Sequence, residues 1–245
     1  MKENIRPDHI WFCDDIFGLK PGWVQKFSDE VAKRDAVIPF KCLGRADLLL
    51  KEDTIDALRR AGCESVWVGA ESGSQKILDA MEKGTTVEQI SASTRLMKQA
   101  GIRVGFFLQY GYPGETRGDI EKTLQMVKDC MPDDIGVSVS YPLPGTKFYE
   151  RVKSQLGEKQ NWVESADLDL MYRGTYPPDF YRALHKLTHK KFRLWQSVEL
   201  IRSKGLRPWS TNLNELRRVV SGAYHLLSLP KVERTLNTLA VQNPG

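Results

Sequence analysis

The chain has 245 residues, 41% of them hydrophobic, which is enough to bury one sizeable core or a core with an appendage. Its formal net charge of +5 and pI near 8.9 are only mildly basic, so charge alone does not indicate a nucleic-acid-binding protein. The sequence contains no apolar run long enough to span a bilayer and shows no signal-peptide pattern. We therefore expect no membrane span and a cytoplasmic location.

The four cysteines are widely scattered and form no disulfide framework, CxxC pair or zinc ribbon. Three of them lie within or beside apolar runs, which favours reduced thiols that act as small hydrophobes. We assign no metal ligand among them: Cys13, Cys42, Cys63 and Cys130.

Five strand-like apolar runs alternate with amphipathic helical patterns in the first part of the chain. The predicted strands are residues 10–13, 38–43, 66–70, 102–109 and 135–140. The predicted helices are residues 23–34, 53–60, 75–81, 86–100 and 119–130, with Thr85 or Thr86 capping the fourth. This alternation predicts an α/β fold with parallel strands and right-handed crossovers.

After Gly145 the pattern changes. A short helix is expected over residues 148–156, an irregular polar connection over 157–178, and helices over 180–204 and 214–229. We therefore predict two regions, a βα layer over residues 1–156 and a C-terminal helical region over 157–245.

The stretch 66–75 is the centre of the first region: a buried apolar strand that ends in Glu71 and leads through Ser72 and Gly73 into a helix. Two interpretations stay open. The turn brings polar groups and bare backbone to a ligand, or it is a tight strand-to-helix turn with Ser72 or Ser74 as the N-cap.

Every predicted strand ends in a polar or glycine-rich cluster, whereas the opposite ends are plainer turns. Parallel strands would gather these clusters at one edge, so the asymmetry predicts a ligand site there. The acidic and hydroxyl-rich composition suits ribose hydroxyls, an ammonium group and a carboxylate. No phosphate-binding glycine motif and no Ser-His-Asp triad is present. The clusters are Asp14-Asp15, Arg45-Asp47, Glu71-Ser72, residues 109–115 and residues 138–145.

Three features of the second region have structural interpretations that we favour over functional ones. His185 and His189 have helical i,i+4 spacing, but without a neighbouring third ligand we interpret them as packed or solvated rather than metal-binding. We interpret the basic segment 182–193 as a solvated helix face rather than a nucleic-acid site. The aromatic residues fit packing of the helices onto the first region better than substrate binding: Trp162, Tyr172, Tyr176 and Trp195.

Five motifs, in order, resemble the radical S-adenosylmethionine (SAM) superfamily, and in particular the branch whose full-length members carry an N-terminal cobalamin-binding domain. The motifs are residues 10–15, 45–47, 68–74, 111–116 and 141–149. The resemblance covers about residues 9–150 and implies a partial (β/α)6 TIM-like barrel that lacks its first βα unit. It also implies S-adenosylmethionine and a [4Fe–4S] cluster at the carboxyl ends of the strands.

The resemblance assigns candidate roles by position. Asp14 and Asp15 match the element that meets the methionine amino group, and Glu71 with Ser72 the element that holds the ribose. Arg45 would meet a carboxylate of the cofactor or substrate. The remaining cofactor-binding candidates match elements beside the adenine: Gly111, Pro113, Gly114, Glu115, Ser140 and Tyr141.

One part of the family pattern is missing. The family's CxxxCxxC loop, whose thiolates bind three irons of the cluster, does not occur in this sequence. The resemblance places that loop before Met1, so we expect the chain to be a fragment, with cobalamin held by a missing N-terminal domain. As such it would be inactive alone and marginally folded, because the strand at residues 10–13 has an unpaired edge.

The first functional hypothesis is thus part of a radical SAM enzyme for methyl transfer or rearrangement at an unactivated carbon. Its expected partners are a small-molecule or lipid-like substrate and a reductant such as flavodoxin or ferredoxin. The second is a non-catalytic remnant that binds S-adenosylmethionine or a protein. The third is an RNA-modifying relative, although the residues make nucleic acid an unlikely partner.

Overall fold

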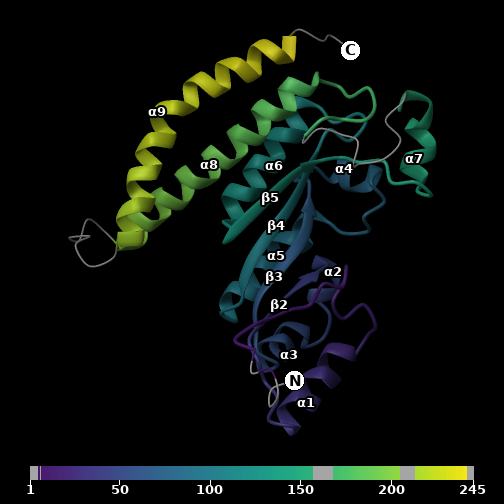
Figure 1. The fold of residues 1–245 in the computed structure, drawn as a ribbon, viewed down its shortest axis with the longest axis vertical. Coiled ribbons are helices and arrows are strands. Elements are labelled where there is room, and N and C mark those ends of the chain that lie inside the picture. The colour runs from purple at the N-terminus through teal and green to yellow at the C-terminus, as the bar shows by residue number, and fades with distance from the viewer. Residues whose placement is uncertain (1–4, 6, 157–167, 205–212, 242–245) are drawn as a thin grey trace. The chain divides into compact units, whose positions relative to one another are not determined.

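The computed structural model describes residues 5, 7–156, 168–204 and 213–241. Five strands form one sheet in the order β1-β2-β3-β4-β5, and the pairings β1–β2, β2–β3 and β3–β4 are parallel (Figure 1). The strands are β1 (Ile10–Trp11), β2 (Phe40–Gly44), β3 (Cys63–Glu71), β4 (Arg103–Tyr110) and β5 (Asp134–Val139). A sheet whose neighbours are consecutive in sequence is the product of successive βα units. The predicted α/β fold of partial TIM-barrel type, with C-terminal helices, is confirmed.

Helices follow the strands as the periodicity predicts. They are α1 (Trp23–Lys33), α2 (Ala46–Leu49), α3 (Thr54–Arg60), α4 (Gln75–Ala80), α5 (Val87–Gln99), α6 (Arg117–Cys130), α7 (Lys147–Val152), the 3-10 turn η1 (Lys153–Gln155), α8 (Pro178–Lys204) and α9 (Leu213–Val241). Thr86 caps α5 and Thr116 caps α6, each in a capping box with the residue three positions on.

The chain forms two compact units. The first comprises residues 1–108 and 132–136, and the second residues 109–131 and 137–245. In the first, an aromatic cluster joins the N-terminal loop, α1 and β2, with ring centroids 4.8 to 5.9 Å apart. In the second, β4, β5 and α6 contribute Tyr110, Val139 and Ile120 to a core shared with Phe180 and Leu184 of α8.

Three details differ from the sequence prediction. β1 has only two residues instead of four, although the Phe12 N–H still donates to the Lys41 carbonyl at 3.0 Å. α2 was not predicted. α9 continues to Val241, past the expected end at 229, with Pro230 inside it. The expected regional boundary after residue 156 adjoins residues 157–167, which lie outside the described residues, as does Trp162.

Within the described ranges, we find no helix long and apolar enough to cross a membrane.

Candidate functional site

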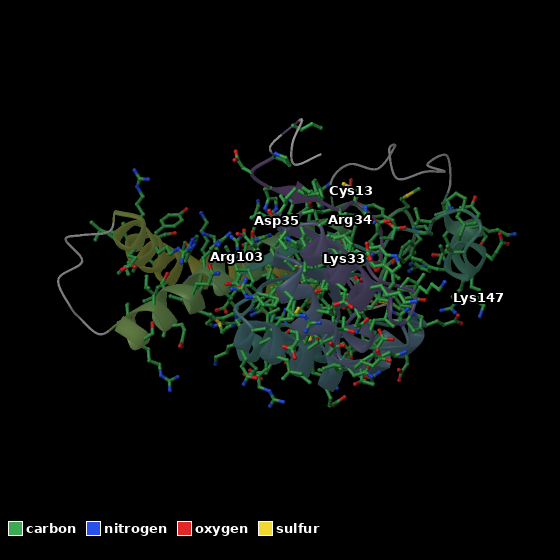
Figure 2. The ribbon with its side chains drawn as sticks, turned by 90° about the horizontal axis from the view of Figure 1, so that it is seen from below. Cys13, Lys33, Arg34, Asp35, Arg103 and Lys147 are labelled. Atoms are coloured by element: carbon green, nitrogen blue, oxygen red, sulfur yellow. The ribbon has the colours of Figure 1, made fainter. Side chains whose placement is uncertain are left out.

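In the first unit, the candidate residues follow the carboxyl ends of β1, β2 and β3. Asp14 and Asp15 lie exposed in the loop after β1. They follow Cys13, which is also exposed and is labelled in Figure 2. This loop runs beside the end of β2, because the Phe17 N–H donates to the Leu43 carbonyl at 2.8 Å. The two aspartates are therefore accessible carboxylates on a loop that β2 holds in place.

Arg45 lies directly after β2 and is held from two sides. Its Nε and Nη2 donate to the two carboxylate oxygens of Asp47 at 3.0 and 3.2 Å, and Nη2 also donates to the Lys83 carbonyl at 3.2 Å. Such a bidentate pair fixes the plane of the guanidinium group. The Arg45 side chain is 37% exposed, so it can still meet a second anion.

Glu71 ends β3 in an unusual conformation. Its φ is 52°, in the left-handed region, and the register with β4 shifts between Gly69 and Glu71. Lys83 Nζ lies 2.7 Å from Glu71 Oε1. A Cβ on Gly69 would come within 2.9 Å of that oxygen, so the absence of a side chain at Gly69 makes room for the ion pair. A non-glycine residue at this φ costs about 1 kcal/mol, and such strain often marks functional sites.

Arg45 and Glu71 are thus brought together through one residue, Lys83, whose carbonyl and ammonium group each contact one of them. The sequence prediction missed Lys83. The available sequence signal was Gly84, which predicts a turn directly after Lys83, and in the structure Glu82 and Gly84 both have positive φ.

Ser72 has a structural role in the turn after β3. It is buried, and its Oγ accepts the Ser74 N–H at 3.1 Å, while Ser74 holds the N-cap position of α4. The Ser72 hydroxyl therefore fits the interpretation as a tight strand-to-helix turn. Glu71 is the residue of this turn whose side chain could contact a ligand.

In the second unit, the candidate residues form the turn between β4 and α6. The Gly111 N–H donates to Glu115 Oε2 at 2.6 Å, and the Glu115 N–H donates to the Tyr112 carbonyl at 2.9 Å. Glu115 is only 1% exposed, so its carboxylate holds the turn from inside. Pro113 is half-buried and Gly114 exposed, and they form the accessible part of the turn.

Three buried tyrosines, Tyr110, Tyr172 and Tyr181, surround this turn. The Tyr172 hydroxyl donates to the Gly111 carbonyl at 2.5 Å, and the Tyr110 hydroxyl lies 3.2 Å from Thr188 Oγ1. Burial is the main cause that raises the pKa of each tyrosine, and the negative charge of Glu115 raises all three further. The phenols stay protonated, and the Tyr172 donor fixes the Gly111 backbone.

The last two candidates follow β5. The Ser140 N–H donates to the Tyr110 carbonyl at 2.8 Å, and Ser140 is buried. Tyr141 is half-buried and packs against both hydrophobic clusters of the second unit. Their backbone thus lies beside the end of β4.

The cysteines of the described residues do not fit a cluster site. Cys42 and Cys63 are buried, and a sulfur contact between them together with burial raises the pKa of Cys42 far above its usual range. Cys13 lies exposed after β1, and Cys130 ends α6. In the part of the chain that the structure describes, no three His, Cys, Asp or Glu side chains group as for a metal ion. The His185 and His189 rings contact each other with centroids 4.5 Å apart and planes tilted by 58°.

Comparison with known families matches residues 19–127 to the radical SAM superfamily. Residues 19–127 thus carry a radical SAM domain. The matched range contains Arg45, Glu71, Ser72, Lys83 and the turn 111–115, so the radical SAM match and the polar residues after β2, β3 and β4 coincide.

Three curated relatives illustrate the range of similar proteins. An uncharacterized methyltransferase of Pyrococcus horikoshii is 28% identical over 65% of this chain, and the anaerobic magnesium-protoporphyrin IX monomethyl ester cyclase of Rubrivivax gelatinosus is 30% identical over 56%. A tRNA uridine(34) acetyltransferase of Methanocaldococcus infernus is 27% identical over 70%. The matched segments span 35%, 26% and 33% of these relatives, so this chain corresponds to about a third of their length.

Two solved structures share the fold at a TM-score of 0.54. The cobalamin-dependent S-adenosylmethionine radical enzyme OxsB is 19% identical over 92% of this chain, which covers 39% of OxsB. The radical S-adenosylmethionine methyltransferase TsrM from Kitasatospora setae, solved with cobalamin and a [4Fe–4S] cluster, is 20% identical over 63% of this chain and 30% of TsrM. These likenesses show that the fold shared with these two structures extends over most of the chain.

Proposed function

We propose that this chain is the S-adenosylmethionine-binding barrel of a radical SAM enzyme that performs methyl transfer or rearrangement at an unactivated carbon with the help of cobalamin. The observation that carries the proposal is the radical SAM match over residues 19–127, which contains a strained, partly exposed Glu71 paired with Lys83.

The first unit offers groups that suit the methionine and ribose parts of S-adenosylmethionine. The Glu71 carboxylate can accept hydrogen bonds from two ribose hydroxyls. Arg45 and Lys83 are cations that can meet the methionine carboxylate, and both side chains are 37% exposed. Asp14 and Asp15 are exposed carboxylates that can accept from the ammonium group.

The second unit offers a turn that suits packing near the adenine. Gly114 is exposed, and a Cβ there would have no atom within 4 Å. A flat base can approach the Pro113–Gly114 backbone closely, while Glu115 and Tyr172 keep that backbone in shape. Ser140 and Tyr141 add backbone and ring contacts at the end of β5 in this proposal.

When bound, a [4Fe–4S] cluster would supply the electron that cleaves S-adenosylmethionine. Because the described cysteines do not fit it, we assign no cluster ligand to them and no step through the cluster. Cobalamin use is supported by the likeness to OxsB and TsrM, and methyl transfer by the likeness to TsrM and the Pyrococcus methyltransferase. A flavodoxin- or ferredoxin-type reductant and a small-molecule or lipid-like substrate complete the proposal.

The test is calorimetric titration of the chain with S-adenosylmethionine, comparing Glu71→Gln with a matched control, Glu64→Gln. Glu64 lies on the same strand near its opposite end and also pairs with a cation, Arg103, at 3.4 Å. Losing charged hydrogen bonds to the ribose costs about 1.5–3 kcal/mol, or about 10- to 100-fold in affinity. We expect this loss in Glu71→Gln and none in Glu64→Gln. Equal affinity of the two variants, or no binding by the parent chain, would contradict the assignment.

Two other functions make different predictions in related assays. A remnant that binds S-adenosylmethionine without chemistry would retain the calorimetric signal, so the coding sequence upstream of residue 1 separates the two: the enzyme requires an in-frame CxxxCxxC motif there, and the remnant does not. An RNA-modifying relative is suggested by the name of the Methanocaldococcus protein, and it would show salt-dependent RNA binding. The basic segment of α8 offers less for this role, since Arg182 pairs with Asp169 and Asp179 and Lys191 with Glu233.

A further inference from the structure

Helices α8 and α9 pack side by side in the second unit (Figure 1), and their contacts define the inner side of α9. Lys190 Nζ donates to Ser228 Oγ at 2.7 Å, and Lys191 Nζ lies 2.9 Å from Glu233 Oε1. A Cβ on Gly222 would come within 2.5 Å of the Ser197 side chain. With Leu229 and Leu236 buried as well, the face of α9 that carries these residues is occupied.

The outer face of α9 carries an apolar stripe. Leu216, Val220, Tyr224 and Leu227 follow one another at spacings of four, four and three residues, which places them on one side of a helix. Their exposed fractions are 44%, 61%, 63% and 83%. Isolated exposed apolar residues are ordinary, but a continuous row of them marks an interaction surface.

The charge on this face has one sign. Arg217, Lys231 and Arg234 are exposed, and none of them forms an ion pair with a carboxylate within the residues that the structure describes. The one carboxylate between residues 216 and 241 is Glu233, which pairs with Lys191. Lys231 and Arg234 continue the line of the apolar stripe and, with Leu227 and Pro230, line a hollow of about 640 Å³.

We propose that the outer face of α9 binds the surface of an anionic lipid bilayer. An apolar row flanked by Lys and Arg, without acidic residues, is the pattern of helices that lie in the plane of a membrane interface. Leu227, Val220 and Leu216 would enter the boundary between headgroups and acyl chains. Tyr224 would lie at headgroup level, with Lys190 Nζ 4.6 Å from its ring centroid, and Lys231 and Arg234 would meet lipid phosphates.

The alternative occupant is a protein, either a second copy of this chain or another partner. A lipid surface is favoured because a single-sign row of cations matches a surface with many anions and needs no shape complement. A protein interface usually excludes charge, lysine above all, from its centre.

The experiment is co-sedimentation of the chain with vesicles of phosphatidylcholine alone and of phosphatidylcholine with phosphatidylglycerol. We expect binding only to the anionic vesicles and a decrease with salt. Two variants test the surface: Val220→Gln with Leu227→Gln, and Lys231→Gln with Arg234→Gln. The second should weaken vesicle binding about thirtyfold, because each cation near the surface contributes about a fivefold factor.

Two controls match these changes. Lys122→Gln with Lys128→Gln removes the same charge from α6 of the same unit, and Leu226→Gln removes an exposed leucine beside the stripe. Both controls should retain most of the binding.

Equal binding to neutral vesicles, no binding at all, or equal losses in variants and controls would overturn the proposal. Concentration-dependent self-association that disappears in the Val220, Leu227 variant would do so as well, because a second copy would then cover the face. None of these outcomes depends on S-adenosylmethionine binding.

Discussion

The candidate residues of the first unit and those of the second unit differ in how their polar groups are held. After β2 and β3, Arg45, Glu71 and Lys83 form a charged network that is partly exposed. In the turn after β4, Glu115 is enclosed by tyrosines and its carboxylate binds backbone. The comparison teaches that residues of the same chemical type, Glu71 and Glu115, serve different purposes: one can contact a ligand, and the other maintains the shape of a loop.

The largest effect should come from Gly111→Ala. Gly111 has φ 83°, and a Cβ there would lie 2.9 Å from Leu170 and 3.2 Å from the Tyr181 ring. Left-handed strain of about 1 kcal/mol and overpacking of about 1–3 kcal/mol should together lower the free energy of unfolding by about 2–4 kcal/mol. Urea denaturation measures it. Gly114→Ala is the control, with the same φ and no atom within 4 Å; it should lose about 1 kcal/mol. Equal losses would mean that the turn is not packed as described.

The next effect is the removal of the Glu115 carboxylate. Glu115→Ala leaves the buried Gly111 N–H without its acceptor, which costs about 1–3 kcal/mol of stability. Glu115→Gln retains an acceptor oxygen and should lose less. Hydrogen exchange of the Gly111 amide reports the same contact locally, and it should accelerate in Glu115→Ala and much less in Glu115→Gln. A more stable Glu115→Ala variant would show that the carboxylate destabilises the folded state, and it would favour a role for Glu115 in ligand binding.

Alkaline pH should destabilise the second unit through its tyrosines. The pKa values of Tyr110, Tyr172 and Tyr181 are raised in the folded state, so above pH 10 the unfolded chain loses these protons first. The folded state then binds more protons than the unfolded state, and stability falls as pH rises from there towards the folded pKa values. Each tyrosine contributes a slope of about 1.4 kcal/mol per pH unit. Tyr172→Phe should reduce the slope of unfolding free energy against pH, and an unchanged slope would contradict the burial of this phenol.

The smallest stability effect belongs to the charged network. Lys83→Met removes the partner of Glu71, but the lysine is 37% exposed, and solvent screening limits the loss to less than about 1 kcal/mol. The free energy of S-adenosylmethionine binding should weaken by more than this loss of unfolding free energy.

A matched pair of variants, Glu71→Gly and Glu71→Ala, isolates the backbone strain at Glu71. Because glycine accepts the φ of 52°, the glycine variant should be the more stable by about 1 kcal/mol. An alanine variant of equal or greater stability would argue against the strain.

Local patterns in the sequence predicted the order of strands and helices except for the short α2, because buried parallel strands and amphipathic helices have distinct periodicities. They also predicted that Thr85 or Thr86 caps α5, where Thr86 does so. The predicted end of α9 at residue 229 was wrong. The helix continues past Pro230 because this proline lies on the exposed side, where water can bind the carbonyl of Leu226 that lost its hydrogen-bond donor.

Local sequence patterns could not predict the contacts between the candidate site residues. Lys83 and Arg45 are 38 residues apart, and Tyr172 and Gly111 are 61 apart. Neither pairing has a local signature, because each arises only when distant segments pack. The sequence therefore identified which loops are polar, without showing that the Glu115 and Ser72 side chains are turned into their own turns.

The hydrogen bond from Tyr172 to Gly111 has a consequence for protein engineering. Leu170, Tyr172 and Tyr181 all come from the chain beyond residue 156, yet they shape the turn that follows β4. A version shortened to its first 156 residues would keep every strand but lose the side chains that pack around Gly111. Grafting the C-terminal segment of a relative onto this barrel would likewise change the conformation of that turn. The turn after β4 and the C-terminal segment should therefore be exchanged together.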